Sequence, residues 1–177
     1  MIFTLYSATL ILALAAFAVL AGFLAPRKPD LASKVPRDRL LGGVLGLVCL
    51  AWSGHHILLM MEGGMARYHN LALVLLAGLG LLCFFFLDYL LVRALGGVLV
   101  LSVNAALHGA FVVELPYRGG FAVLCYALAL GAMVMIAVPW RVRHLLERAA
   151  ESATWRRTLS TVASAAAAVI LVYLLMA

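Results

Sequence analysis

The chain has 177 residues, of which 67% are hydrophobic and 11% charged, with a formal net charge of +6. Soluble domains have about a quarter charged and roughly half apolar residues, so this composition excludes an ordinary water-soluble protein. The apolar residues also fall in long blocks, and about 18 or more in a row can cross a bilayer as a helix that satisfies its own backbone. We therefore predict an all-α, polytopic integral membrane protein.

Six apolar blocks are long enough to be transmembrane helices. They cover about 2–24, 40–61, 70–87, 94–115, 119–138 and 159–176. No basic residue precedes Arg27, and the first block is too long for the apolar core of a signal peptide, so we expect a retained span. Only Asp88 and Arg93 interrupt the run between the third and fourth blocks, which predicts a short, tight turn there. Together the six spans make a single transmembrane domain, 1–177.

Two segments of the sequence are nearly the same. Residues 39–47 (RLLGGVLGL) and 93–101 (RALGGVLVL) are identical at seven of nine positions, and a weaker copy begins at Arg157. Each copy opens an apolar block just after a basic residue, so we expect three out–in–out hairpins, at about 1–61, 69–115 and 119–177, related by an internal repeat. The alternative is chance similarity, because leucine, glycine and valine are common in all membrane helices.

Lysine and arginine are distributed unevenly between the two sides of the predicted bundle. Eleven of the 13 lie in three connections on one side: Arg27, Lys28, Lys34, Arg37, Arg39, Arg93, Arg141, Arg143, Arg148, Arg156 and Arg157. The positive-inside rule places these connections in the cytoplasm and both termini on the outer, periplasmic side of a bacterial inner (plasma) membrane. The positive charge is therefore a topology signal that matches anionic lipids, and it does not indicate a nucleic-acid partner.

Residues 141–153 have a pattern of their own. Val142, Leu145 and Leu146 fall on one face of a helix there, while the charged residues lie elsewhere. We expect a short amphipathic helix on the cytoplasmic surface.

Histidines gather near the predicted outer ends of the second and fourth spans. His55 and His56 follow Arg39 by 16 and 17 residues, and His108 follows Arg93 by 15. At 1.5 Å per residue all three lie about 23–26 Å from the cytoplasmic boundary. Because imidazoles on facing helices are axial ligands of b-type haem, one interpretation is a haem between His108 and either His55 or His56.

Copper is a second interpretation, because thioether and imidazole ligands suit Cu(I). The residues that would join His55 and His56 in such a site are Met60, Met61, Met65 and His69. A third is proton or quinol chemistry by a histidine with Glu62 or Glu114. The fourth, which we favour, is that no cofactor binds and that these side chains reach the interface or hydrogen-bond to neighbouring helices.

One strongly polar residue lies near the middle of a predicted span. Asn104 precedes His108 by four residues and therefore shares its helix face. Polar groups within spans usually face the bundle interior, so we expect Asn104 to be buried against a partner group.

Catalytic signatures are missing from the sequence. It contains no phosphate-binding loop, zinc motif, nucleophile motif or paired-cysteine motif, and no sizeable soluble domain. No charge lies near the midplane and no proline lies inside a span, which argues against the discontinuous helices of a transporter. We therefore expect a non-catalytic accessory or structural subunit, packed against other subunits of an inner-membrane complex. The alternatives are an electron-transfer or metal-handling protein and a small-solute transporter.

Overall fold

The computed structural model describes residues 2–27, 34–61 and 67–177. Six helices in these ranges are long and apolar enough to span a membrane, and no strand occurs among the described residues. The predicted all-α membrane fold with six spans is therefore confirmed.

The helices follow one another with short connections. The first span is α1 (Ile2–Val19), continued by the π-helical turn η1 (Leu20–Leu24) and by α2 (Ala25–Arg27). The 3₁₀ turn η2 (Val35–Arg37) leads into α4 (Arg39–Met60), which is followed by α5 (His69–Phe86) and α6 (Leu90–Val112). The chain ends with α7 (Arg118–Ala137), α8 (Trp140–Glu151) and α9 (Ala153–Met176).

Two helix boundaries show how local residues fix the spans. Asp38 caps α4, because its carboxylate accepts hydrogen bonds from the backbone N–H groups of Leu40 and Leu41 at 2.9 and 3.1 Å. The predicted tight turn before α6 is also confirmed, since only residues 87–89 separate it from α5, and Tyr89 adopts a left-handed φ of 57°. The last span begins six residues earlier than predicted, because α9 starts directly after α8 and carries Arg156 within its first turns.

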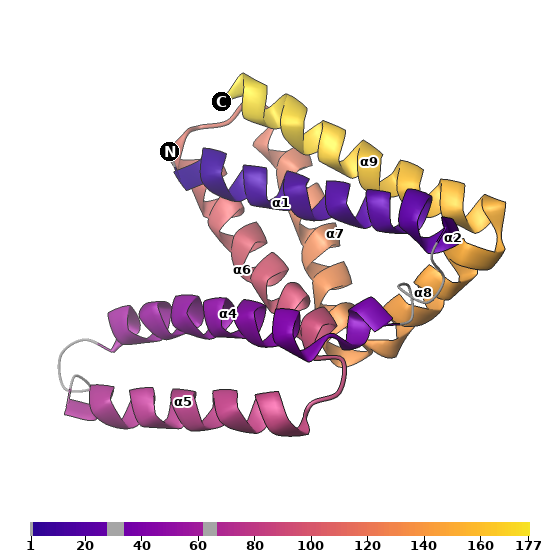
Figure 1. The fold of residues 1–177 in the computed structure, drawn as a ribbon. Helices are drawn as coiled ribbons and strands as arrows, with labels where there is room; N and C mark the ends of the chain where they lie inside the picture. The colour runs from indigo at the N-terminus through magenta and orange to yellow at the C-terminus, as the bar shows by residue number, and fades with distance from the viewer. Residues whose placement is uncertain (1, 28–33, 62–66) are drawn as a thin grey trace.

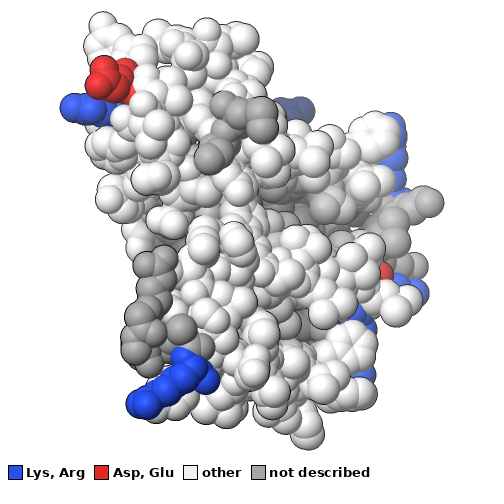
Figure 2. All heavy atoms as spheres, turned by 90° about the vertical axis from the view of Figure 1, so that its left-hand side faces the viewer, with Lys and Arg blue, Asp and Glu red and all other residues white. Residues whose placement is uncertain are grey.

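The bundle has two ends (Figure 1). At one, which we call the terminal end, lie both chain termini and the C-terminal ends of α4 and α6. At the other, which we call the α8 end, lie α8, α2, the 87–89 turn and the first residues of α4 and α6. Figure 2 looks onto the terminal end, where the visible Lys, Arg, Asp and Glu side chains of the described residues lie at the margins of the face.

Helix α6 is the centre of the packing. It contacts α1, α4 and α7, and it has a larger buried share than any other span of the described chain. Small side chains permit this close packing; those buried on α6 are Ala94, Gly96, Ser102, Ala106, Gly109 and Ala110. Helix α1 lies along α9, and α5 packs mainly on α4 (Figure 1). The predicted three hairpins are not confirmed as packing units, because the main contacts pair helices from different hairpins.

The repeated Gly-Gly pairs mark helix crossings. A Cβ added at Gly42 of α4 would lie 2.6 Å from the backbone nitrogen of Leu91 in α6. At the matching position of α6, a Cβ added at Gly96 would lie 2.8 Å from the carbonyl oxygen of Ala132 in α7. These contacts give both glycine pairs a packing role in their own helix, and they do not require a repeated hairpin.

Three aromatic rings join helices at the terminal end. Phe3 of α1 and Phe121 of α7 meet edge to face with ring centroids 5.6 Å apart, and Phe121 meets Tyr173 of α9 in the same way at 5.2 Å. Both phenylalanines are buried, Phe121 completely. The rings therefore hold α1, α7 and α9 together beside α6.

The predicted amphipathic segment forms α8, whose apolar face is turned toward the protein. Leu146 and Ala149 are buried together with Ala21 of η1, and Phe17 and Leu159 pack against them. The charged face includes Arg143, whose Nε donates to Glu147 one turn later at 2.6 Å. This helix is therefore part of the bundle and closes its α8 end.

Candidate functional site

His56 belongs to a short chain of aromatic side chains. The indole N–H of Trp52, one turn earlier in α4, donates a hydrogen bond to Nε2 of His56 at 2.9 Å. The Trp52 ring in turn stacks on Tyr6 of α1, with centroids 5.0 Å apart and planes 20° from parallel. Because an indole nitrogen can only donate, His56 Nε2 carries no proton and its lone pair is occupied. A haem or metal at Nε2 would have to displace the indole.

His55 does not point to the same place as His56. Successive helix residues are about 100° apart around the axis, and these two rings lie 6.0 Å apart at an angle of 56°. Both side chains are exposed. The two side chains therefore leave α4 in different directions, and their role as ligands stays a prediction.

His69 has a structural contact at the start of α5. Its Nε2 lies 2.9 Å from the carbonyl oxygen of Met61, which follows the last residue of α4. A carbonyl can only accept, so His69 donates and joins the ends of the two helices. This contact satisfies one of the carbonyl groups that a helix end leaves without a partner.

The copper interpretation gains no support from the described side chains. No three His, Cys, Asp or Glu residues in the described ranges come together in a way that could hold a metal ion. His69 is engaged with a carbonyl, Met60 is the last residue of α4, and Met65 lies outside the described residues. Copper binding here stays a prediction.

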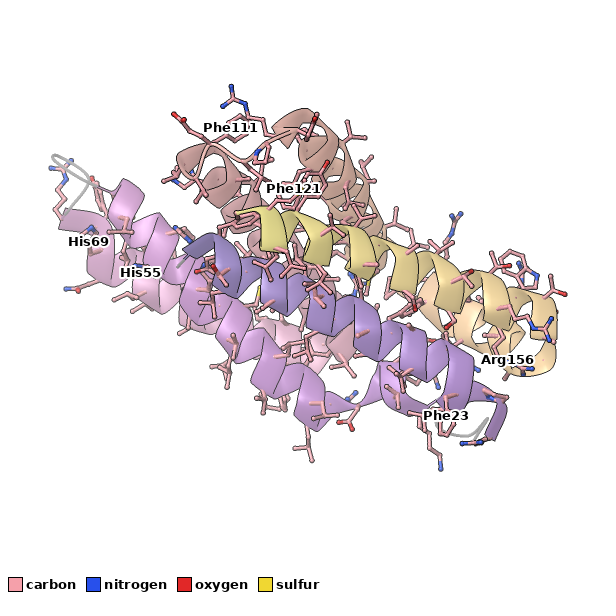
Figure 3. The ribbon with its side chains drawn as sticks, turned by 90° about the horizontal axis from the view of Figure 1, so that it is seen from above. Phe23, His55, His69, Phe111, Phe121 and Arg156 are labelled. Atoms are coloured by element: carbon pink, nitrogen blue, oxygen red, sulfur yellow. The ribbon has the colours of Figure 1, made fainter. Side chains whose placement is uncertain are left out.

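Asn104 and His108 lie on the surface of α6. Both side chains are exposed, so the prediction that Asn104 is buried within this chain is wrong. The reason lies in the directions of the helices, because α4 and α6 are close at the α8 end and far apart at the terminal end (Figure 1). In Figure 3, His55 and His69 lie at the end of the α4–α5 pair, apart from Phe111, which follows His108 by three residues.

The exposed polar groups continue the faces along which α4 and α6 meet. A Cβ at Gly97 of α6 would touch Sγ of Cys49 in α4 at 2.8 Å. Seven residues are about two helical turns, so Asn104 follows Gly97 on the same face, and His56 follows Cys49. We call the diverging region marked by His56, Asn104 and His108 the α4–α6 wedge. The haem interpretation would place its ligands here, and it stays a prediction.

A second polar cluster, which was not predicted from the sequence, lies at the α8 end. Arg37 donates to the Tyr89 hydroxyl at 3.1 Å, and its guanidinium lies 5.1 Å from the centre of the Tyr89 ring. Hydrogen bonds from Arg143 and then Arg37 lower the pKa of Tyr89, and the Arg143 hydrogen bond lowers the pKa of Glu147. The cluster therefore ties η2, the 87–89 turn and α8 together. The spacing of four residues between Arg143 and Glu147 indicates their ion pair, because residues four apart are neighbours on a helix surface.

The two clusters differ in what they can do. The α8-end cluster is internally paired, whereas in the wedge only His56 is bonded, to Trp52 of its own helix, and Asn104 and His108 are exposed on an apolar span. No family model matches the chain, and no curated protein or solved structure matches it.

Proposed function

We propose that the protein is a non-catalytic accessory subunit of a larger inner-membrane complex, and that a helix of another subunit covers the α4–α6 wedge. The exposure of Asn104 on α6 is the observation that carries this proposal. Asn104 lies 14 residues after Leu90, or about 21 Å along the helix, and so inside a hydrocarbon core of roughly 30 Å.

The energetics of this position favour a protein neighbour over lipid. Lipid tails offer no hydrogen-bond partner, and moving an amide from water into hydrocarbon costs roughly 4–8 kcal/mol. A polar group on a neighbouring helix would offset part of that cost, and interhelical hydrogen bonds of this kind contribute about 0.6–2 kcal/mol each. The wedge therefore has the chemistry of a subunit contact.

Helix α5 supports the same proposal independently. None of its 18 residues, all of them described, is buried, and it packs mainly on α4. A span that stabilises its own bundle so little is well suited to contact another protein. The absence of catalytic motifs from the sequence fits a role in assembly.

We also propose that the α8 end faces the cytoplasm, because most lysines and arginines of the chain belong to its connections. A cysteine placed at Arg118 should react with a membrane-impermeant maleimide on intact cells. A cysteine at Lys34 should react only after permeabilisation. Both residues are exposed, so access to the reagent depends on the side of the membrane. Labelling of Lys34→Cys alone on intact cells would show that the orientation is inverted.

The partner contact is tested by Asn104→Leu, which removes the amide and keeps the volume similar. We expect native mass spectrometry of the wild type, extracted gently from its own membrane, to show a particle far heavier than 18.9 kDa. In the variant, the ratio of partner-bound to bare protein should fall at least about threefold. One interhelical hydrogen bond of about 0.6 kcal/mol corresponds to that factor. Asn70→Leu, the same substitution at the second residue of α5 and outside the wedge, is the control and should retain more of the heavy particle than Asn104→Leu does.

Other outcomes would redirect the assignment. Full retention of partners by Asn104→Leu would show that the wedge is not the contact. A bare chain in the wild-type sample would contradict the accessory role. A bare chain with the added mass of a haem or copper would favour the electron-transfer or metal-handling alternative, with His55, His56 and His108 as the first residues to replace.

A further inference from the structure

A groove between α4 and α5 forms a hollow at the bundle surface. Its volume is about 760 Å³. Its walls are leucine, valine, alanine, phenylalanine and glycine, with Cys83 as the one side chain of another kind. The lining includes Gly43, Gly46, Ala77 and Gly80. An occupant in this groove must be apolar, because its walls offer no charged or hydrogen-bonding side chain.

Glycine creates the depth of the groove. A Cβ added at Gly46 would find no atom within 4 Å, so this position on α4 opens directly into the hollow. Toward the terminal end the two helices close, because a Cβ added at Gly54 would lie 2.5 Å from Cδ2 of Leu76. Near the start of α4 the helices are also close, because a Cβ added at Gly43 would lie 2.8 Å from Cε2 of Phe84, so the hollow around Gly46 is bounded at both ends.

The length of the groove matches one leaflet. On α4 it extends from Leu40 to Ala51, which is 11 steps along the helix or about 17 Å. Half of a hydrocarbon core of roughly 30 Å is about 15 Å. A spanning helix of a partner would need a groove that continues across both leaflets. A single acyl chain needs only one, so the dimensions favour a lipid.

The α8 end of the groove is basic. Arg37 and Arg39 are exposed immediately before Leu40, the first lining residue. The carboxylate of Asp38 between them accepts two backbone N–H groups of α4 and so is engaged in capping. Asp88 is exposed in the neighbouring turn, and Arg37 also donates to Tyr89, while Arg39 makes no such contact within the described part of the chain. Arginine beside an apolar groove at the membrane surface complements a lipid phosphate.

We propose that the α4–α5 groove binds one acyl chain of an anionic phospholipid whose phosphate lies beside Arg37 and Arg39. The lipid would fill the hollow between a bundle helix and the otherwise weakly attached α5. This site is separate from the α4–α6 wedge, and it does not depend on the accessory role.

The test is lipid retention by the full-length protein. The protein is reconstituted in nanodiscs of phosphatidylglycerol and phosphatidylcholine in equal amounts, released into mild detergent, and weighed by native mass spectrometry. We expect wild type to retain one phosphatidylglycerol in preference to phosphatidylcholine. Gly46→Leu fills the groove and should abolish retention. Gly78→Leu on α5 is the matched control, because a Cβ there also meets no atom within 4 Å and the residue does not line the groove.

A second variant separates the headgroup from the acyl chain. Arg39→Gln leaves the groove unfilled and should weaken phosphatidylglycerol retention about fivefold, while Arg157→Gln, another exposed arginine at the α8 end, should not. Because this change leaves the helix packing intact, it remains informative if Gly46→Leu does not fold. Equal retention of both lipids, or undiminished retention by Gly46→Leu, would overturn the proposal. Loss of a bound polypeptide in Gly46→Leu would also overturn it, in favour of a protein contact.

Discussion

Gly42→Leu is expected to separate α4 from α6 and to lower the free energy of unfolding by about 3 kcal/mol. There is no room even for the first side-chain atom. An added Cβ would lie 2.6 Å from the backbone nitrogen of Leu91 and 2.9 Å from the carbonyl carbon of Leu90. A backbone cannot rotate away as a side chain can, so the helices must move apart. Overpacking usually costs about 1–3 kcal/mol, and a backbone obstacle places this variant at the upper end.

Gly46→Leu is the control for that measurement, because it introduces the same side chain one turn later on α4. Its Cβ meets no atom within 4 Å, and leucine favours a helix over glycine by nearly 1 kcal/mol. Unfolding of both variants by SDS in mixed micelles, followed by far-ultraviolet circular dichroism, should show a loss for Gly42→Leu and none for Gly46→Leu. An equal loss in both would mean that glycine is needed here for another reason than the α6 contact.

The six spans were predictable because the bilayer imposes a length and a composition on any helix that crosses it. The predicted start at residue 40 and the observed start at Arg39 differ by one residue. The error at the last span has a physical cause, since arginines at a helix end can extend into the interface without ending the helix. Block boundaries follow hydropathy, whereas helix boundaries follow backbone hydrogen bonds.

Which helices pack together could not be predicted in the same way. The predicted hairpins paired neighbours in sequence, but α1 lies along α9 and α6 contacts α1, α4 and α7. All the spans are apolar on every side, so hydropathy does not show which face meets a neighbour. Asn104 illustrates the consequence, because it lies within α6 but its side chain is exposed. Helix directions decide whether such a side chain is covered.

The contacts of the candidate residues are also of two kinds, those within one helix and those between helices. The contact between Trp52 and His56 joins residues four apart on one helix, and so was accessible from spacing alone. The stacking of Tyr6 on Trp52 joins α1 to α4, and the contact of Arg37 with Tyr89 spans 52 residues. Contacts between helices depend on helix packing, which the sequence pattern did not reveal.

Phe121→Ala is expected to destabilise the bundle by roughly 1–3 kcal/mol, measured as the free energy of SDS-induced unfolding. Phe121 is fully buried and meets both Phe3 and Tyr173 edge to face. In water-soluble proteins this substitution costs about 3–5 kcal/mol, through lost transfer free energy and the cavity left behind. In a bilayer the separated helices keep their phenylalanines in lipid, so the transfer part largely vanishes and the cavity and ring contacts remain.

Phe86→Ala distinguishes packing from any general effect of losing an aromatic ring. Phe86 ends α5 and its side chain is 81% exposed, so its replacement should change stability by less than about 0.5 kcal/mol. A small loss at both positions would show that Phe121 does not hold α1, α7 and α9 together. A loss at Phe121 as large as in soluble proteins would instead mean that water reaches this region when the helices separate. The stability lost in Phe121→Ala therefore shows whether lipid or water surrounds Phe121 once the helices separate.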